Sequence, residues 1–459
     1  MMTDKINRKA ILTVTLISSF FNPFMGAAIN IALPQIEKEL SLNAVSMSWV
    51  AMAYLMASAV FLVPAGKLAD IIGRKRMFLY GNIVFTLGSL ICAVSVNSFM
   101  LISFRFVQGL GSAMFFSSAM AIVISAFPLN ERGKIIGLSV SAVYLGLTAA
   151  PFFGGILTQY LGWRSLFYIN FGIELILILI IIFKIKQEWV EAQNENLDIA
   201  GSVVYIFSMS SLMYGLSKLP DNMAIILTAI GLTGMVIFVL METKIKFPVL
   251  EIKLFANNRV FAFSNLAALI NYAATFAIAF MLSLYLQYVK GLSPRDAGII
   301  LMTQPAVMTL TASFSGRLSD RFDSGIIASI GMGIIVIGLV LLSYISIDTK
   351  YQYIFMSLVI LGLGFGTFSS PNTNSVMSSV EKRYLGVASA TVSTMRVSGQ
   401  MISMAIAAMI IHILIGDAII EKSNFNLLTQ SINILFKLFA GLCLLGVFAS
   451  LARGKTKIN

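Results

Sequence analysis

One short charged stretch sets the topology of this chain: Gly66-Lys67-Leu68-Ala69-Asp70-Ile71-Ile72-Gly73-Arg74-Lys75-Arg76. It lies between two apolar runs, near residues 46–65 and 77–95. Each run is close to the length of about 20 residues that an α-helix needs to cross the hydrocarbon core of a bilayer. We therefore expect a transmembrane helical hairpin whose connecting loop spans residues 66–76.

The residues of this turn are those that a pivot between two helices needs. Gly66 and Gly73 permit close approach of the backbone. Asp70 can accept hydrogen bonds from the N-terminus of a neighbouring helix. The basic cluster that begins at Arg74 favours the cytoplasmic side of a membrane. We therefore expect Gly66, Asp70, Gly73 and Arg74 to form a conformational motif.

The composition is that of a polytopic membrane protein. Of the 459 residues, 58% are hydrophobic and 11% are charged, and the mean hydropathy is +0.90. A soluble protein carries about 25% charged residues. The net charge of +12 would suit a nucleic-acid partner, but most of the 32 lysines and arginines lie between apolar runs on the side of the termini. This asymmetry predicts that both termini are cytoplasmic, and we expect no nucleic acid as a partner.

Fourteen apolar runs are long enough to cross a bilayer. They lie near residues 10–33, 46–65, 77–95, 99–126, 134–158, 163–184, 199–218, 222–241, 259–289, 293–315, 325–346, 351–377, 385–415 and 429–452. These runs predict an all-α membrane protein with fourteen transmembrane helices.

An internal repeat explains this number. The motif Gly66-Lys67-Leu68-Ala69-Asp70 recurs as Gly316-Arg317-Leu318-Ser319-Asp320, and Gly109-Leu110-Gly111 recurs as Gly362-Leu363-Gly364. The fourth span therefore corresponds to the twelfth, whereas two adjacent six-helix halves would place the repeat six spans later. We expect an N-terminal six-helix half at 1–184, two extra helices with flanking cytoplasmic loops at 185–258, and a C-terminal six-helix half at 259–459.

Two of these patterns resemble signatures of the major facilitator superfamily. The turn at 66–76 looks like the signature between its second and third spans, G-x-L-a-D-x-x-G-R-K/R. The run from Arg105 to Gly111 is similar to its fourth-span signature R-x-x-q-G-x-g, whose arginine is tied to proton coupling. An isolated cation at the bilayer centre costs roughly 2.5–3.5 kcal/mol, so Arg105 should face a cavity or a partner. The alternative is that Arg105 only bridges helices.

A further motif lies in the fifth predicted span. Gly146, Pro151, Gly154 and Gly155 resemble the pattern g-x-x-x-G-P-x-x-G-G of drug and proton exchangers, with Ala150 in place of one glycine. Small residues let two helices touch, and proline adds a bend point about which the halves can rock. The resemblance implies export. The alternative is a close helix crossing without a role in transport.

With Pro371–Met377 and Gly386–Ala390 in the second half, nearly the whole chain resembles the fourteen-span drug:H+ antiporter family of the EmrB/QacA type. The resemblance implies the major facilitator fold, with two six-helix halves plus two inserted central helices. It implies a proton-coupled secondary exporter of amphipathic or cationic drugs, working by alternating access as a monomer in the plasma (inner) membrane. Its partners would be a small amphipathic substrate, protons and the lipid bilayer. Neither enzyme activity nor a cofactor is expected.

One departure from the family leaves the coupling open. The acidic residue that the family often has in its first span is replaced by Met25. The acidic residue expected deep in a span is Glu174, and burial disfavours the charged form of such a group. Arg105, Glu174 and Asp70 are therefore the candidates for coupling, with structural pairing as the alternative for Glu174. A facilitator or exporter of one specific endogenous metabolite or lipid is the alternative function.

By the same resemblance, a substrate cavity lies between the halves. Its polar residues would be Asn30, Gln108, Tyr144, Asn271, Gln304, Asn372, Asn374 and Arg396. No metal site is expected, because Cys92 and Cys443 each lie within an apolar run and His412 is the only histidine.

Overall fold

The structure, a computed structural model, describes residues 7–192, 195–319, 321–381, 385–416 and 418–454, and only the backbone of 129–130, 132–134, 136, 253 and 385–386. In this part of the chain, fourteen helical segments are long and apolar enough to cross a membrane. The number predicted from the apolar runs is therefore confirmed, and the protein is an all-helical, multi-pass membrane protein.

The first eight spans are continuous helices. They are α1 (Arg8–Leu40), α2 (Ala44–Ile72), α3 (Arg74–Ala93), α4 (Ser98–Ala126), α5 (Leu129–Leu161), α6 (Arg164–Lys184), α7 (Ile199–Lys218) and α8 (Asn222–Glu242), and the short α9 (Ile252–Asn257) follows them.

Two of the remaining six spans are interrupted. The ninth consists of α10 (Arg259–Ala273), α11 (Ala277–Leu284) and the π-helical η1 (Tyr285–Val289), and the tenth of α12 (Pro294–Leu301) and α13 (Thr303–Ser319). The others are α14 (Ser324–Leu342), α15 (Tyr351–Ser378), α16 (Leu385–Leu414) and α17 (Phe425–Ala452), which the 3-10 turn η3 (Lys422–Asn424) precedes. Interruptions at membrane depth are tolerated where neighbouring helices cover the freed backbone groups.

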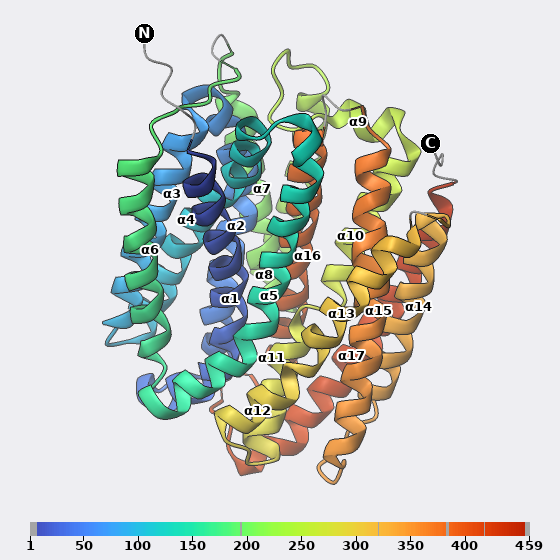
Figure 1. Ribbon diagram of the computed structural model, residues 1–459. Coiled ribbons are helices and arrows are strands. Elements are labelled where there is room, and N and C mark those ends of the chain that lie inside the picture. The colour runs from blue at the N-terminus through green and yellow to red at the C-terminus, as the bar shows by residue number, and fades with distance from the viewer. Residues whose placement is uncertain (1–6, 193–194, 320, 382–384, 417, 455–459) are drawn as a thin grey trace.

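The helix packing repeats itself in the two halves. In the first half α3 packs on α4, α2 on α4, α1 on α5 and α3 on α6. The corresponding pairs in the second half are α14 on α15, α13 on α15, α10 on α16 and α14 on α17. Figure 1 shows α1–α6 on one side of the molecule and α13–α15 and α17 on the other. This pairing agrees with the internal repeat, while the exact domain boundaries near residues 184 and 258 stay predictions.

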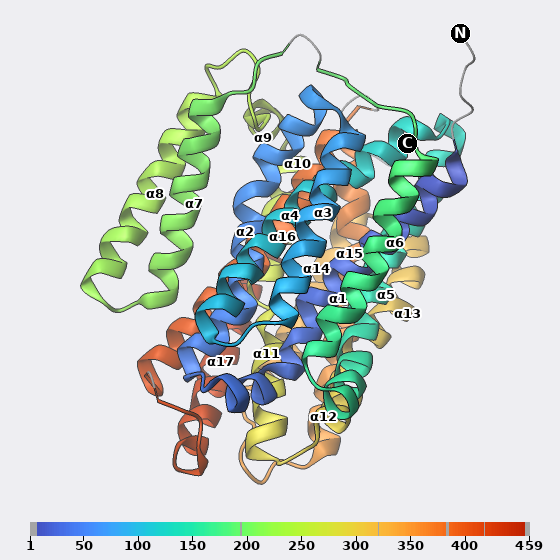
Figure 2. The same cartoon turned by 90° about the vertical axis from the view of Figure 1, so that its left-hand side faces the viewer.

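The inserted pair lies at the edge of the molecule. Figure 2 shows α7 and α8 as a hairpin beside the two halves. Its α7 packs on α2 of the first half and on α16 of the second. Tyr205 donates a hydrogen bond to the carbonyl of Ala59 at 3.2 Å, and His412 Nε2 lies 3.6 Å from Asp221 Oδ1. The pair therefore contacts both halves.

The turn at residues 66–76 differs from the loop that we expected. Helix α2 continues through Ile72 and α3 begins at Arg74, so only Gly73 lies outside a helix. Between Gly66 and Gly73 the chain has no proline and includes the good helix formers Lys67, Leu68 and Ala69, which lets α2 extend by two turns. Gly73 has a φ of +116°, a conformation that residues with a Cβ rarely adopt. The helix therefore ends where glycine permits the reversal.

The halves are joined at one end of the spans. We call the end at which α1 begins and α17 ends the terminal face, and the other end the opposite face (Figure 1). Toward the opposite face, Ser283 Oγ donates a hydrogen bond to the carbonyl of Asn30 at 2.8 Å. Tyr288 donates to Glu37 Oε2 at 3.0 Å. These bonds tie α11 and η1 of the second half to α1 of the first.

Helix α5 closes the same face against α12. A Cβ on Gly155 would lie 2.5 Å from the carbonyl oxygen of Pro294 and 3.1 Å from Arg295 Cα. One turn further along α12, Gly298 packs against the carbonyl of Pro151. Glycine at both positions lets the two backbones touch. At this contact the backbones of the two halves touch, so a side chain at either glycine would push α5 and α12 apart.

Replacing Gly155 with alanine should weaken this closure. The new Cβ would meet a backbone oxygen that cannot rotate away, and overpacking of this kind costs about 1–3 kcal/mol. That cost would shift the equilibrium away from the closed opposite face by about 5-fold to 150-fold. We expect slower transport in proteoliposomes and faster labelling of Gln287→Cys by an impermeant maleimide.

Gly172→Ala is the matched control, because a Cβ on Gly172 meets nothing within 4 Å. Equal transport and labelling by the two alanine variants would show that the α5–α12 contact is not needed for closure.

Candidate transport site

A cavity lies between the two halves. Its deeper part is lined by residues of α1, α2, α4, α5 and α16, among them Tyr54 and Ser112. A second part, nearer the terminal face, is lined by residues of α1, α4, α5, α10, α15 and α16. Phe116, Val143 and Arg396 belong to the walls of both parts. We therefore treat the two parts as one central cavity.

The walls of the central cavity combine apolar side chains with hydroxyl groups from both halves. The hydroxyl groups belong to Thr15, Ser19, Ser58, Ser112, Ser139, Tyr144, Tyr272, Thr373, Ser389 and Ser393, and to Tyr54. Tyr144 and Ser369 share a hydrogen bond that links α5 to α15. Among the described wall residues, Arg396 is the one with a charged side chain. Its guanidinium carbon lies 5.1 Å from the ring centroid of Phe116.

Arg105 lies behind this wall, fully buried within the first half. Its Nε donates to the carbonyl of Val50 on α2 at 3.1 Å, and Nη1 donates to Gln108 Oε1 at 2.6 Å. Gln108 Nε2 donates to Ser89 Oγ on α3 at 2.6 Å, and Asn170 Nδ2 on α6 donates to the same oxygen at 2.8 Å. These hydrogen bonds give the buried cation of Arg105 the polar partners that a charge at this depth requires. They also join α2, α3, α4 and α6.

Tyr54 connects this network to the cavity. The guanidinium carbon of Arg105 lies 4.5 Å from the centroid of the Tyr54 ring, a distance typical of a cation–π contact. The Tyr54 hydroxyl lies 3.1 Å from Asn22 Oδ1 and 3.1 Å from Ser112 Oγ. All three of these residues line the central cavity. One aromatic ring therefore separates Arg105 from the cavity.

Glu174 lies one helical turn beyond Asn170 on α6 and is also fully buried. Within the described part of the chain, neither of its carboxyl oxygens has a hydrogen-bond partner, and Asn170 Oδ1 has none either. Tyr54 lies within electrostatic reach of both Arg105 and Glu174. A buried carboxyl group without hydrogen bonds is costly in its charged form, so the protonation of Glu174 is sensitive to what surrounds it.

Asp70, the third candidate for coupling, lies far from this network. It belongs to the same helix as Val50, and twenty residues of α-helix extend about 30 Å at 1.5 Å per residue. At the terminal face, Asp70 Oδ1 accepts from Arg74 Nε at 2.8 Å. The structure therefore brings Arg105 and Glu174 into one network and places Asp70 in another.

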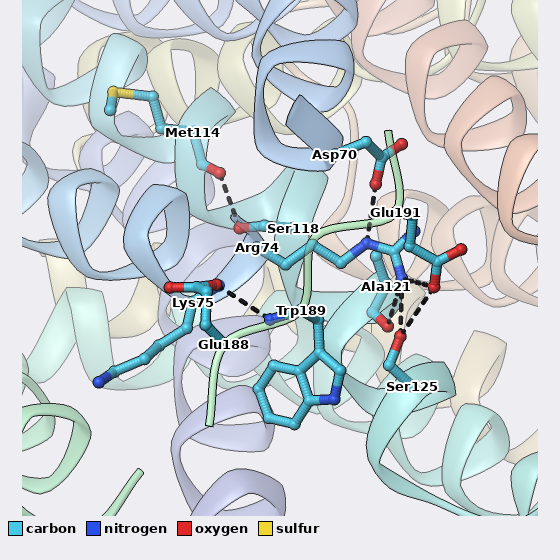
Figure 3. Close-up of polar contacts among 10 residues, drawn as sticks. All are labelled: Asp70, Arg74, Lys75, Met114, Ser118, Ala121, Ser125, Glu188, Trp189 and Glu191. Atoms are coloured by element: carbon cyan, nitrogen blue, oxygen red, sulfur yellow. Dashed lines mark hydrogen bonds and ion pairs between the residues drawn. The ribbon is translucent and has the colours of Figure 1, made fainter. Parts of the chain in front are cut away.

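That second network joins the turn to the segment between α6 and α7, residues 185–198, which we call the acidic linker. Figure 3 shows Arg74 between Asp70 and Glu191. Arg74 Nη1 lies 2.9 Å from Glu191 Oε1 and donates to Ser125 Oγ on α4 at 2.6 Å. Lys67 Nζ lies 2.5 Å from Glu195 Oε2. The basic turn is therefore neutralised by the acidic linker.

Glu188 of the acidic linker caps α3. Its carboxylate accepts from the backbone N–H of Lys75 at 2.8 Å and of Arg76 at 3.2 Å. A negative charge there also opposes the positive end of the α3 dipole. A Cβ on Gly73 would lie 2.5 Å from the Glu188 carboxyl carbon. These contacts were not predicted from the amino-acid sequence, although an acidic linker directly after the half that contains the basic turn is a signal for them.

Backbone bonds complete the attachment of the acidic linker. The N–H of Arg74 donates to the carbonyl of Trp189 at 2.9 Å. The N–H groups of Glu191 and Ala192 donate to the carbonyl of Asp70 at 3.1 and 3.0 Å. The acidic linker is therefore held to the end of α2 by backbone hydrogen bonds as well as by ion pairs.

The fifth-span motif holds α5 on α1 as well as on α12. Gly146 packs against the carbonyl of Phe20, and a Cβ on Gly154 would lie 3.0 Å from Ala28 Cβ. Gly155 and Pro151 face α12, as described above. One helix thus uses its small residues to contact its own half and the other half.

Of the eight polar residues expected in the cavity, Tyr144 and Arg396 line the cavity described above. The other six lie elsewhere, which corrects the expectation. Gln108 belongs to the Arg105 network, and the carbonyl of Asn30 takes part in the closed opposite face. Asn271 is fully buried, and its amide has no hydrogen-bond partner.

The remaining three residues pack within the second half. Asn372 Nδ2 donates to the carbonyl of Ser264, and its Oδ1 accepts from Arg453 Nη1 at 3.1 Å. Asn374 donates to Ser319 Oγ at 3.1 Å, and the carbonyl of Gln304 packs against Gly362. The side chains of Asn372 and Asn374 thus take part in hydrogen bonds between helices of the second half.

Arg453 is a buried charge that the sequence analysis did not single out. It follows the last residue of α17, and its guanidinium bonds to Asn372 and to the hydroxyls of Ser264, Ser375 and Ser450. Burial lowers the pKa of Arg453 to about 10, while the charge of Asp323 acts in the opposite direction. Arg453 thus ties α10, α15 and α17 together at the terminal face.

The chain resembles known proteins over most of its length. Residues 15–404 match the family model of the Major Facilitator Superfamily. The riboflavin transporter RibZ of Clostridioides difficile is 31% identical over 389 residues, covering 84% of each chain. The methylenomycin A resistance protein of Bacillus subtilis is 31% identical over 393 residues, again covering 84% of each chain. The multidrug resistance protein Stp of Mycobacterium tuberculosis is 27% identical and covers 87% of this chain and 76% of its own.

A solved structure supports the fold. The human organic anion transporter MFSD10 matches with a TM-score of 0.64, at 13% identity, over 97% of this chain and 99% of that chain. At this identity the likeness shows the fold alone. The family match, the fourteen spans and the relatives together show that this chain belongs to the major facilitator superfamily and is a membrane transporter, not an enzyme.

Proposed function

We propose that this protein is a proton-coupled secondary exporter of amphipathic compounds, acting as a monomer by alternating access across the plasma (inner) membrane. The observation that carries the proposal is the central cavity, whose walls combine apolar surface and hydroxyl groups from both halves. Secondary transporters bind substrate at such an interface between repeats. Export of drugs is supported by two relatives whose names describe resistance to methylenomycin A and to multiple drugs.

The distribution of charge supports an orientation with the terminal face in the cytoplasm. The basic turn from Lys67 to Arg76 lies on the terminal face, where positive residues favour the cytoplasm. In this orientation the closed opposite face is extracellular, and the cavity part lined by Tyr144 and Arg396 is the part nearer the cytoplasm. The structure would then represent the inward-facing state.

Single cysteines in a variant without Cys92 and Cys443 test this orientation. Arg76 and Val96 are suitable positions, because their exposures are 63% for the side chain of Arg76 and 75% for Val96. In intact cells, an impermeant maleimide should label Val96→Cys and leave Arg76→Cys unlabelled until the membrane is opened. The reverse pattern would place the terminal face outside the cell.

We propose that the turn at Gly73, held by the acidic linker, is the conformational gate on the cytoplasmic side. A carrier that rocks between two states must form and break one set of contacts in each cycle. The contacts of Arg74 with Asp70 and Glu191 are suited to this, because they join the first half to the segment that leads to α7. Asp70 thus acts in gating rather than in proton coupling.

Gly73→Ala should reduce transport by about tenfold or more, because a non-glycine residue at such a φ costs about 1–3 kcal/mol and its Cβ meets Glu188. The amount of protein in the membrane should change little. Gly172→Ala is again the control, since a Cβ there meets nothing within 4 Å. Normal transport by Gly73→Ala would reduce the turn to a simple connection.

We propose that Glu174 binds the proton and that Arg105 and Tyr54 connect its charge state to the cavity. The protonated acid suits an apolar site without hydrogen bonds, and loss of the proton would create a negative charge near the Arg105 network. That charge would change the field at Tyr54, whose hydroxyl lies in the cavity wall. A binding site and a protonation site are thereby linked without direct contact.

Glu174→Gln should abolish transport driven by a pH gradient while substrate binding persists, because glutamine keeps the shape and removes the titrating group. Arg105→Ala should abolish active transport, and Arg105→Lys should also fail, since lysine cannot reproduce the separate bonds to Val50 and Gln108. Proteoliposomes with an imposed pH gradient measure substrate transport, and an internal pH dye measures the accompanying proton flux. Asp348→Asn, at an exposed loop carboxylate, is the control. Normal gradient-driven export by Glu174→Gln would exclude Glu174 as the proton site.

The alternative function is a facilitator, or an exporter of one endogenous metabolite or lipid. Two observations favour it: buried Met25 stands where the family often has a carboxylate, and one relative is named a riboflavin transporter. Riboflavin flux that follows only the riboflavin gradient, and ignores an imposed pH gradient, would support this alternative.

A further inference from the structure

The central cavity has a distinct electrostatic character. Among its described wall residues, Arg396 is charged and no carboxylate is present. Arg396 belongs to both parts of the cavity and comes from α16 of the second half. Any ligand that fills the cavity must therefore lie close to one positive charge.

Arg396 is also a charge without a counter-ion. In the described part of the chain, its guanidinium has no ion pair and no hydrogen bond, and its recorded contact is with the Phe116 ring at 5.1 Å. Phe116 lies on α4, so this contact crosses from one half to the other. A guanidinium has five donors in a planar fork that matches the oxygens of a carboxylate, sulfonate or phosphate. Those donors remain available for a ligand.

Three carboxylates of the described chain that lie within or at the ends of the spans have other positions. Glu174 lies within the first half behind Tyr54 and Arg105, Glu37 is hydrogen-bonded to Tyr288 toward the opposite face, and Asp70 pairs with Arg74 at the terminal face. None of them lines the cavity. The protein around the cavity lowers the effective dielectric below that of bulk water, so the unpaired charge of Arg396 acts on a ligand more strongly than a charge on the outer surface would.

We propose that the central cavity selects anionic amphipathic compounds, whose acidic group binds Arg396 and whose aromatic or aliphatic body lies against the apolar wall. The proposal rests on the proposed function and narrows its substrate class. Hydroxyl groups from both halves, including Ser19, Tyr272 and Ser389, stand in the same part of the cavity and can donate to the remaining oxygens of the anion. A cationic compound of the same shape meets an unpaired like charge and no carboxylate, so it binds poorly.

Binding of three matched naphthalenes to the purified protein in lipid nanodiscs tests this selectivity. The probes are 2-naphthoate, the neutral 2-naphthamide and the cation 2-naphthylmethylammonium, which share one aromatic body and differ in charge. Calorimetry without any gradient should show the carboxylate binding at least about tenfold more tightly than the ammonium, as expected for one unscreened charge contact. Equal affinities, tighter binding of the ammonium, or no binding of 2-naphthoate would overturn the proposal.

Variants at Arg396 assign the selectivity to this residue. Arg396→Gln should reduce the preference to within about twofold, Arg396→Lys should retain most of it, and Arg396→Glu should reverse it. Lys437→Gln is the matched control, because Lys437 is an exposed cation on α17 that contacts Tyr344 and does not line the cavity. Size-exclusion profiles identify variants that do not fold. If Arg396→Gln does not fold, Arg396→Lys is compared with the wild type instead. A preference that persists in Arg396→Gln would also overturn the assignment.

The two proposals fail in different ways. Charge selectivity in nanodiscs with no proton-driven flux in proteoliposomes would contradict the proposed export mechanism and leave the anion site standing. Proton-driven export of the ammonium probe in preference to the carboxylate would contradict the anion site and leave the export mechanism standing.

Discussion

A charge inside an apolar interior needs a partner, because no bulk water is present to solvate it, and three arginines of this protein meet that need in different ways. Arg105 bonds to a backbone carbonyl and an amide within the first half. Arg453 bonds to hydroxyls and an amide within the second half. Both charges therefore hold helices of one half together. In the described part of the chain Arg396 has no such bonds. It faces the central cavity, where an anionic substrate can supply the counter-ion.

The glycines of α5 explain how two rigid halves can meet and separate. Gly146 and Gly154 hold α5 on α1, so α5 moves with the first half. Gly155 presents bare backbone to Pro294 on α12, and this contact joins the halves where the opposite face is closed. A contact of that kind is all-or-none, because backbone atoms at such distances either fit or separate. We therefore propose that the bistability required for the proposed alternating access resides in this helix packing.

We propose that the turn at Gly73 has the corresponding role at the terminal face and that it acts through electrostatics. Its basic residues are neutralised by carboxylates of the acidic linker, which lead on to the inserted helix pair. That pair contacts α2 and α16, one helix from each half. The inserted helices are therefore connected by packing and by charge to the parts that we propose to move.

Local patterns predicted the fold well, for reasons that particular residues make clear. Apolar run length gave the fourteen spans, because a bilayer imposes nearly the same length on every crossing. The glycine at position 73 marked the reversal between α2 and α3, although the helix extends closer to it than the charged residues implied. The cavity residues were predicted less well. Neighbouring residues of a helix point about 100° apart, so Asn372 bonds to Arg453 while Thr373 lines the cavity, and Asn271 is buried while Tyr272 lines it.

The amino-acid sequence by itself determined the membrane class, the number of spans, the repeat and the depth at which Arg105 and Glu174 lie, since each follows from local composition and spacing. The tertiary structure decided which polar residues face the cavity, which acidic residues meet the basic turn, and which arginine remains without a counter-ion. These depend on the rotation of each helix about its axis and on contacts such as Arg74 with Glu191, more than one hundred residues apart. Such contacts exist only once the helices have packed.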